Sequence, residues 1–199
     1  MNGRIFLLSP ASATGKRAAQ LLNPNAQFDL AVRLRAEGVK LGDAFAFVSG
    51  LYFRGKLAYA RAFAGARDSI HVLTSGRGLL SPDTIITADD LRRFADGSID
   101  LADQRYVSAL RADAERLAAA DPAVVILLGS IASGKYVDVL LPLFGGRLVF
   151  PSEFVGRGDM SRGGLMLRSV REGRELSYIP IVGAARRGAR PPKLEPIAR

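Results

Sequence analysis

The segment 124–136 (VVILLGSIASGKY) joins an apolar run, a turn of small residues and the start of an expected helix. A short aliphatic run bounded by glycine is typical of a strand buried on both faces, as in a parallel sheet. Gly129, Gly134 and Lys135 also match the phosphate-binding pattern G-x-x-x-x-G-K, but Tyr136 stands where a P-loop has the Ser or Thr that holds magnesium. The segment therefore predicts a strand–turn–helix unit and argues against a magnesium-nucleotide site.

Other segments of the chain repeat this alternation of strand and helix. Strands are expected at residues 5–8, 70–74, 148–150 and 178–182, and helices at 15–22, 28–35, 51–63, 103–120 and 135–144. Such alternation predicts an α/β fold, a single domain with a mostly parallel central sheet and helices on both faces. Pro180 places the last strand at a sheet edge. The domain is expected over residues 1–182, followed by a flexible basic tail over 183–199.

Composition narrows the class of protein. With 199 residues, 48% of them hydrophobic and 24% charged, the chain is expected to fold as one globular domain. No apolar run approaches the ~20 residues of a membrane span, and the N-terminus lacks a signal-peptide pattern, so we expect a cytoplasmic protein without a membrane partner. The absence of cysteine excludes disulfides, and the single histidine, His71, excludes multi-histidine metal sites. No metal or cofactor is predicted.

The net charge of +9 favours a polyanionic partner, most simply a nucleic acid and in particular DNA. The tail from Gly183 to Arg199 holds five basic residues against one acidic residue, and so contributes +4 of this charge. The alternative is that the charge only keeps the protein soluble. Nothing in the sequence indicates the oligomeric state.

Three polar loops follow the expected strands, at residues 9–16, 74–83 and 129–136. In open parallel sheets, ligands bind at the carboxyl ends of the strands, where such loops meet. The loops are rich in Ser, Thr and Gly, whose small side chains leave backbone N–H groups accessible to anionic atoms. We therefore expect Ser9, Asp83 and Tyr136 to line one polar cleft. The alternative is that the small residues serve only tight turns.

Five stretches, in order, resemble the YaaA family of peroxide-stress proteins. They are residues 5–14 (IFLLSPASAT), 44–52 (AFAFVSGLY), 72–83 (VLTSGRGLLSPD), 131–136 (IASGKY) and 157–166 (RGDMSRGGLM). The resemblance implies a DNA-binding protein linked to protection from oxidative damage, and more distantly a sheet similar to that of uracil-DNA glycosylases. Three positions depart from the family pattern: Lys135 replaces an acid, Arg77 a tyrosine and Ser12 a lysine.

The candidate site residues follow from the chemistry of base removal, which needs a carboxylate, a stacking ring and donors for the leaving base. The catalytic candidates are Asp83, Glu153 and Asp159. The candidates for substrate binding are Ser9, Ser12, Tyr52, Ser75, Arg77, Ser133, Lys135 and Tyr136. The candidates for nucleic-acid binding are Arg157, Arg162, Arg186 and Arg187, and residues 153–162 are expected to form a loop over the pocket. Turn, capping, packing and ion-pair roles are the alternatives for these side chains.

The leading hypothesis is a nucleic-acid-acting protein, a DNA-binding N-glycosidase that excises bases, with modified bases in DNA repair or phage defence as candidate substrates. A second hypothesis is a non-catalytic DNA-binding protein of oxidative stress. A third, a nucleotide-dependent enzyme that uses the loop after Gly129, requires magnesium-dependent binding that Tyr136 disfavours.

Overall fold

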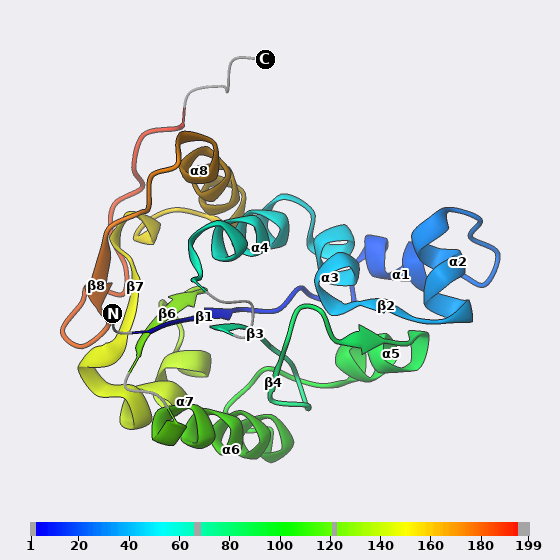
Figure 1. Cartoon of the computed structure of the whole chain (residues 1–199), viewed down its shortest axis with the longest axis horizontal. Coiled ribbons are helices and arrows are strands. Elements are labelled where there is room, and N and C mark those ends of the chain that lie inside the picture. Colours follow the sequence, from blue (N-terminus) through cyan, green and yellow to red (C-terminus); the bar gives the residue numbers. More distant parts are fainter. Residues whose placement is uncertain (1–2, 66–68, 121–122, 195–199) are drawn as a thin grey trace.

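Six strands form a central sheet in the order β4-β3-β1-β6-β7-β8 (Figure 1). The computed structural model describes residues 3–65, 69–120 and 123–194. The parallel strands are β1 (Arg4–Leu8), β3 (Ile70–Leu73), β6 (Val124–Leu128) and β7 (Leu148–Pro151). The antiparallel edge strands are β4 (Leu79–Leu80) and β8 (Tyr178–Pro180). The mostly parallel sheet and the edge position of Pro180 are as predicted.

Two pairs of helices cover the two faces of this sheet (Figure 1). On one face lie α4 (Leu51–Phe63) and α8 (Asp159–Glu172), and on the other α6 (Gln104–Ala120) and α7 (Gly134–Phe144). The side chains of the two central strands are buried on both faces, from Ile5 to Leu8 and from Val125 to Leu128. This burial explains the unbroken apolar runs in the sequence. The predicted single α/β domain is confirmed.

A third group of elements lies beyond the carboxyl ends of the central strands (Figure 1). It consists of α1 (Lys16–Leu22), α2 (Asp29–Ala36), α3 (Leu41–Ser49), α5 (Ala88–Asp96) and an antiparallel ribbon of β2 (Val39–Lys40) and β5 (Ile85–Ile86). Sequence reasoning missed α3, α5 and the ribbon. The start of α5 carried a signal, because Thr87 and Asp90 form a reciprocal capping box.

Only residues 155–158 of the segment 153–162 form the predicted loop. Two short 3₁₀ turns flank β7: η2 (Gly145–Arg147) before it and η3 (Ser152–Phe154) after it. The next helix, α8, begins at Asp159. α8 contains the adjacent glycines Gly163 and Gly164, and glycine is a poor helix former. Contact with a neighbouring helix supplies the stability that propensity does not.

That contact is a close crossing of α4 and α8. A Cβ atom added at Gly55 would lie 2.7 Å from the carbonyl oxygen of Gly163, and one added at Gly163 would lie 2.9 Å from the Cα of Tyr52. Both positions therefore require the absence of a side chain, and the two helix backbones touch directly. The crossing sets the first turn of α8 beside the first turn of α4.

The described part of the tail, residues 183–194, has no helix or strand and runs beside the domain toward α8 (Figure 1). Arg186 pairs with Asp138 of α7 at 3.6 Å, and the carbonyl oxygen of Pro192 accepts a hydrogen bond from Arg157 at 3.3 Å. The segment predicted to be flexible thus contacts the folded domain at two places at least. Among the described residues, no helix has the length and apolar character needed to cross a bilayer.

We expect Gly55→Ala to lower the free energy of unfolding by about 2 kcal/mol, because the new methyl group forces the crossing helices apart. Urea denaturation measures this change. Gly164→Ala is the matched control in α8, since the nearest atom to its added Cβ lies at an ordinary contact distance of 3.6 Å. The control should leave stability unchanged or raise it by up to about 1 kcal/mol. A Gly55→Ala variant as stable as the wild type would contradict the role of the crossing.

Candidate functional site

A pocket of about 610 Å³ lies where the chain leaves β1 and β6 in opposite directions. β1 leads through α4 to β3 on one side, and β6 leads through α7 to β7 on the other, so this point is a topological switch of the sheet. We call the cavity the sheet-edge pocket. It is lined by residues 9–15, Phe45, Val48, Ser49, Tyr52, Ser75, Phe94, Ala95, residues 97–99, Ser130, Lys135, Tyr136 and Asp159.

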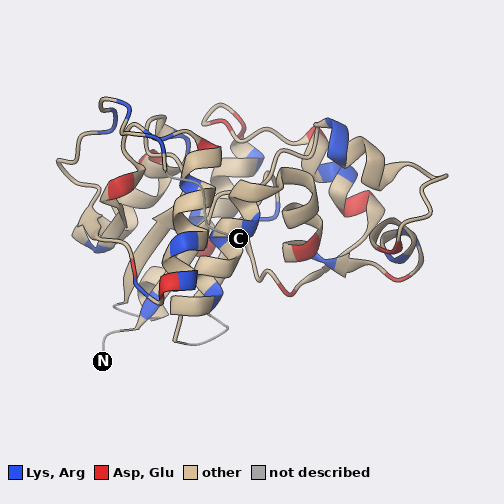
Figure 2. Ribbon diagram, turned by 90° about the horizontal axis from the view of Figure 1, so that it is seen from above, with Lys and Arg blue, Asp and Glu red and all other residues tan. Residues whose placement is uncertain are grey.

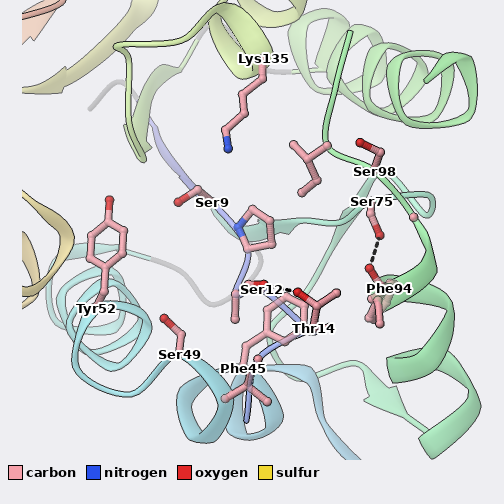
Figure 3. A pocket seen from close by; sticks show the side chains of 18 of the residues that line it. Ser9, Ser12, Thr14, Phe45, Ser49, Tyr52, Ser75, Phe94, Ser98 and Lys135 are labelled. Carbon is pink, nitrogen blue, oxygen red and sulfur yellow. Dashed lines mark hydrogen bonds between the residues drawn. The ribbon is translucent and has the colours of Figure 1, made fainter. Parts of the chain in front are cut away.

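Seven of the residues predicted from the sequence line this pocket together. They are Ser9, Ser12, Tyr52, Ser75, Lys135, Tyr136 and Asp159. The Lys135 side chain points into the pocket toward Ser9, while Tyr52 and Ser75 lie on opposite sides of it (Figure 3). The three loops expected to converge at the sheet edge therefore do so.

Asp83 does not face this pocket, and its predicted place there is wrong. Antiparallel β4 carries the chain back, so that Asp83 lines a separate hollow beside Ile70, the first residue of β3. Its carboxylate pairs with Lys40 at 2.9 Å and with Arg61 at 3.4 Å. The two-residue strand that reverses the chain is too short to produce a recognisable pattern in the sequence.

Arg77 and Ser133 also lie outside the lining of the sheet-edge pocket. Arg77 is exposed in the β3–β4 turn, where it pairs with Asp90 at 3.2 Å. Ser133 is the exposed residue that precedes α7, and Ser130, earlier in the same loop, lines the pocket instead. A strand–turn–helix prediction fixes the loop but not the direction of each side chain within it.

The remaining candidates lie around the start of α8 and along the tail. Glu153 accepts a hydrogen bond from the backbone N–H of Ser177 at 3.0 Å and lines a different hollow. Arg157 donates to the Glu153 carbonyl oxygen, and the buried Arg162 donates from Nε and Nη2 to the Phe154 carbonyl oxygen. Arg186 and Arg187 are exposed in the tail. Of the three predicted catalytic carboxylates, only Asp159 lines the sheet-edge pocket.

Gly129, the first glycine of the P-loop-like pattern, has a packing role. A Cβ atom added there would lie 3.1 Å from the Cβ of Ser9, so its absence lets the β1 and β6 loops approach closely. At the other end of the pattern, the carbonyl oxygen of Lys135 accepts a 2.6 Å hydrogen bond from the Tyr106 hydroxyl group. The Gly129 contact accounts for one position of the G-x-x-x-x-G-K pattern without a bound nucleotide, whereas the Tyr106 hydrogen bond only holds the backbone at Lys135.

Tyr52 presents a buried hydroxyl group that has no hydrogen-bond partner among the described residues. Burial raises the pKa of Tyr52 to about 12 against the opposing effect of the nearby Arg162, and burial also raises the pKa of Tyr136. Both hydroxyls therefore stay protonated at neutral pH, and that of Tyr52 is available as a donor. An unpaired buried donor on a pocket wall is costly, and a ligand acceptor would relieve that cost.

Lys56 is the residue that sequence reasoning did not select. It is fully buried in α4, donates to the Ser9 carbonyl oxygen and lies 2.8 Å from Ser9 Oγ. The rings of Tyr52 and Phe53 flank its ammonium nitrogen at 4.3 and 5.0 Å from their centroids. Burial lowers the pKa of Lys56 to about 7, with Asp159 opposing and Arg162 and Lys135 reinforcing the shift. The signal in the sequence was a lysine on the apolar stripe of the helix at 51–63.

The site thus combines one carboxylate, one pocket-facing ammonium group, two tyrosine hydroxyls and several serines. Ser12 and Thr14 hydrogen-bond to each other at 3.0 Å, and Ser75 donates to the Phe94 carbonyl oxygen at 3.0 Å (Figure 3). Within residues 3–65, 69–120 and 123–194, no cluster of three or more His, Cys, Asp or Glu side chains exists that could hold a metal ion. The arrangement suits a polar organic ligand that carries both acceptors and negative charge.

These features define an α/β protein with a polar ligand pocket at the switch point of its sheet. The chain matches no protein-family model, no curated protein and no solved structure. The resemblance to the YaaA family therefore stays a prediction that rests on its five motifs. The geometry of the pocket is the basis for the functional argument.

Lys56 should make the stability of the protein depend on pH. Its pKa is near 7 in the folded protein and near 10.5 in an unfolded chain, so between these values only the unfolded chain holds the proton. Stability contributed by this residue therefore rises with pH across that window. We expect the free energy of unfolding to rise by about 2 kcal/mol more in the wild type than in Lys56→Met between pH 7 and pH 9.

Urea denaturation at a series of pH values measures the two slopes. Lys16→Met, at an exposed lysine of α1, is the matched control and should keep the wild-type slope. Identical slopes for the wild type and Lys56→Met would contradict the lowered pKa of the buried amine.

Proposed function

We propose that this protein takes a nucleotide of a nucleic acid, most simply DNA, into the sheet-edge pocket and hydrolyses the bond between its base and its sugar. The observation that carries the proposal is the position of Asp159 at the border between this pocket and a second, cationic groove. A nucleotide has its sugar between its base and its phosphates. A carboxylate at the border is therefore suited to act on the sugar.

The second groove, of about 770 Å³, runs between the start of α8 and the tail. We call it the cationic groove, because Arg157, Arg168, Arg190 and Lys193 line it. The Nε atom of Arg168 is buried without a hydrogen-bond partner among the described residues. Clustered guanidinium groups are well suited to phosphate oxygens, so this groove is our candidate track for the nucleic-acid backbone.

The sheet-edge pocket has walls suited to a base. Phe45 of α3 and Phe94 of α5 contact each other edge to face, with ring centroids 5.9 Å apart, and both line the pocket. Both rings are almost fully buried, so they form an apolar floor beneath a base rather than an exposed stacking face, and the unpaired Tyr52 hydroxyl supplies a donor for a base carbonyl or ring nitrogen. The pocket volume is within the usual range for small-molecule sites.

Hydrolysis would divide the chemical roles between Asp159 and Lys135. The Asp159 carboxylate stabilises the positive charge that develops on the sugar and orients the attacking water. The Lys135 ammonium group, which points into the pocket, stabilises negative charge on the departing base (Figure 3). Asp159, whose side chain is 66% exposed, pairs with Arg162 at 3.5 Å within the first turn of α8.

Because basic and acidic side chains are mixed over most of the chain, we expect the nucleic acid to bind at the cationic groove rather than across a whole face of the protein. Lys and Arg occur along most elements of the chain, with Asp and Glu between them (Figure 2). The net charge of +9 assists approach to a polyanion, while the cationic groove supplies the specific contacts.

We expect Asp159→Asn to reduce the rate of abasic-site formation at least 100-fold while nucleic-acid affinity changes little, because the amide cannot stabilise the developing cation. The assay incubates the protein with oligonucleotides that carry plain or modified bases, and detects abasic sites by cleavage in alkali. Asp83→Asn is the matched control, since Asp83 lies in a separate hollow.

The control should retain wild-type activity. If no plain or modified oligonucleotide yields abasic sites with the wild type, the enzymatic proposal fails. Salt-sensitive binding without turnover would instead support a non-catalytic nucleic-acid-binding protein.

We expect Arg190→Ala and Lys193→Ala each to weaken nucleic-acid binding and to reduce the slope of log affinity against log salt by about 1, because each removes one phosphate contact. Fluorescence anisotropy with a labelled oligonucleotide measures both quantities. Arg111→Ala, at an exposed position of α6 on the opposite face of the sheet, is the control. An equal loss of affinity in all three variants would indicate only a general effect of charge.

A further inference from the structure

The contact between Lys56 and Ser9 has no part in base excision as described above. The amine of Lys56 is enclosed beneath the loop that follows β1, and it reaches Ser9 Oγ at 2.8 Å. Among the described residues, no carboxylate lies within ion-pair distance of this amine. A buried lysine without a counter-ion is expensive to retain, whereas a methionine of similar length would fill the same space without that cost.

The protonation state of Lys56 decides the direction of the Ser9 hydroxyl. A charged ammonium group donates to the Ser9 carbonyl oxygen and to Oγ, and the Oγ proton then points to the Leu128 carbonyl oxygen at 3.3 Å. A neutral amine has a lone pair, which accepts the Oγ proton instead. The neutral state therefore prepares Ser9 to lose its proton to Lys56.

The surroundings of Lys56 favour this neutral state near pH 7. Burial lowers the pKa of the amine most, and the positive charges of Arg162 on α8 and Lys135 on α7 lower it further. Asp159 on α8 opposes them. From its own helix, the amine faces the rings of Tyr52 and Phe53, and Tyr52 remains protonated in this pH range.

Ser9 is 4% exposed, and it lines the sheet-edge pocket on the side away from Lys56. The Lys135 ammonium group points toward Ser9 from one wall, and the Tyr52 ring lies across the pocket (Figure 3). The Tyr52 hydroxyl is more than nine-tenths buried and has no partner among the described residues. A positive charge and an unused donor beside a hydroxyl group suit an electrophile that carries negative oxygens.

We propose that Ser9 is a nucleophile activated by the neutral amine of Lys56, and that its substrate class is a phosphate ester bound in the sheet-edge pocket. Ser9 Oγ forms a bond to phosphorus, and its proton passes to Lys56 Nζ. The bond from phosphorus to the leaving group breaks, and the leaving group departs with the electron pair. The products are phosphoryl-Ser9 and an ammonium group on Lys56. Lys135 and Tyr52 stabilise the negative oxygens on phosphorus.

This chemistry does not depend on base excision and is tested on its own. The full-length protein is incubated with a fluorescent fluorophosphonate between about pH 5 and pH 9, and the adduct is located by peptide mass spectrometry. In the wild type we expect an adduct on Ser9 whose rate of formation rises with pH to a plateau, with a midpoint near 7. Ser9→Ala should give no adduct, and Lys56→Met should react at least about tenfold more slowly.

Two matched controls isolate the pair. Lys16→Met and Ser108→Ala change an exposed lysine and an exposed serine, and both should be labelled as fast as the wild type. Asp159→Asn should still be labelled, with the midpoint moved to lower pH, because its carboxylate raises the pKa of Lys56. This variant separates the present proposal from base excision, for which Asp159 is required.

Three results would overturn the proposal. They are the absence of a Ser9 adduct at every pH, equal labelling of Lys56→Met and wild type, and a wild-type rate that climbs without a plateau up to pH 9, as for an ordinary serine. The last measurement needs no variant, so it decides the matter even if Lys56→Met fails to fold. Release of nitrophenolate from bis(4-nitrophenyl) phosphate or from 4-nitrophenyl phosphate then distinguishes a diester from a monoester substrate.

Discussion

The crossing of α4 and α8 at Gly55 and Gly163 brings together the side chains that line the sheet-edge pocket from these two helices. Each helix alone carries only part of the site. Direct contact of the two backbones brings the first turn of α8, with Asp159, beside the turn of α4 that carries Tyr52 and Lys56. A side chain at either glycine would force the helices apart, and the carboxylate would move away from the pocket wall with them. The close packing of the two helices therefore also determines where Asp159 lies relative to the pocket.

The central strands supply the rigid counterpart to this crossing. β1 and β6 pair in register from Arg4 with Val124 to Leu8 with Leu128, so Ser9 and Gly129 leave the sheet side by side. Because Gly129 has no side chain, Ser9 can approach it closely. The carbonyl oxygen of Ser9 accepts a hydrogen bond from the Lys56 amine. Ser9 is consequently held by the sheet on one side and by α4 on the other. A residue fixed in this way loses little further entropy when a ligand arrives.

The periodic parts of the sequence predicted the sheet and the helices that cover it, because an apolar pattern reports directly which faces are buried. They also predicted that three loops meet at one edge. The predictions were wrong where contacts between segments distant in the sequence determine the local structure. Asp83 was misplaced because two-residue β4 reverses the chain, and α8 was missed because Gly163 is favourable only against α4. Lys56 could have been selected as a charged residue on a buried helical stripe, but its contact with Ser9 spans 47 positions and has no local signature.

Two opposite walls of the sheet-edge pocket come from different parts of the fold, an outer wall from α3 and α5 and an inner wall from the loops of the sheet. The ribbon of β2 and β5 ties together the chain segments that carry α3 and α5, and these helices present Phe45 and Phe94 to the cavity. The inner wall, with Ser9 and Lys135, belongs to the sheet and its loops instead. Phe45 also packs edge to face against Phe53 of α4, so exchange of the Phe94 ring would reshape the cavity with less effect on Ser9 and Lys56 than exchange of Phe45. Such a division would allow the preferred ligand to change in evolution while the residues proposed to react are retained.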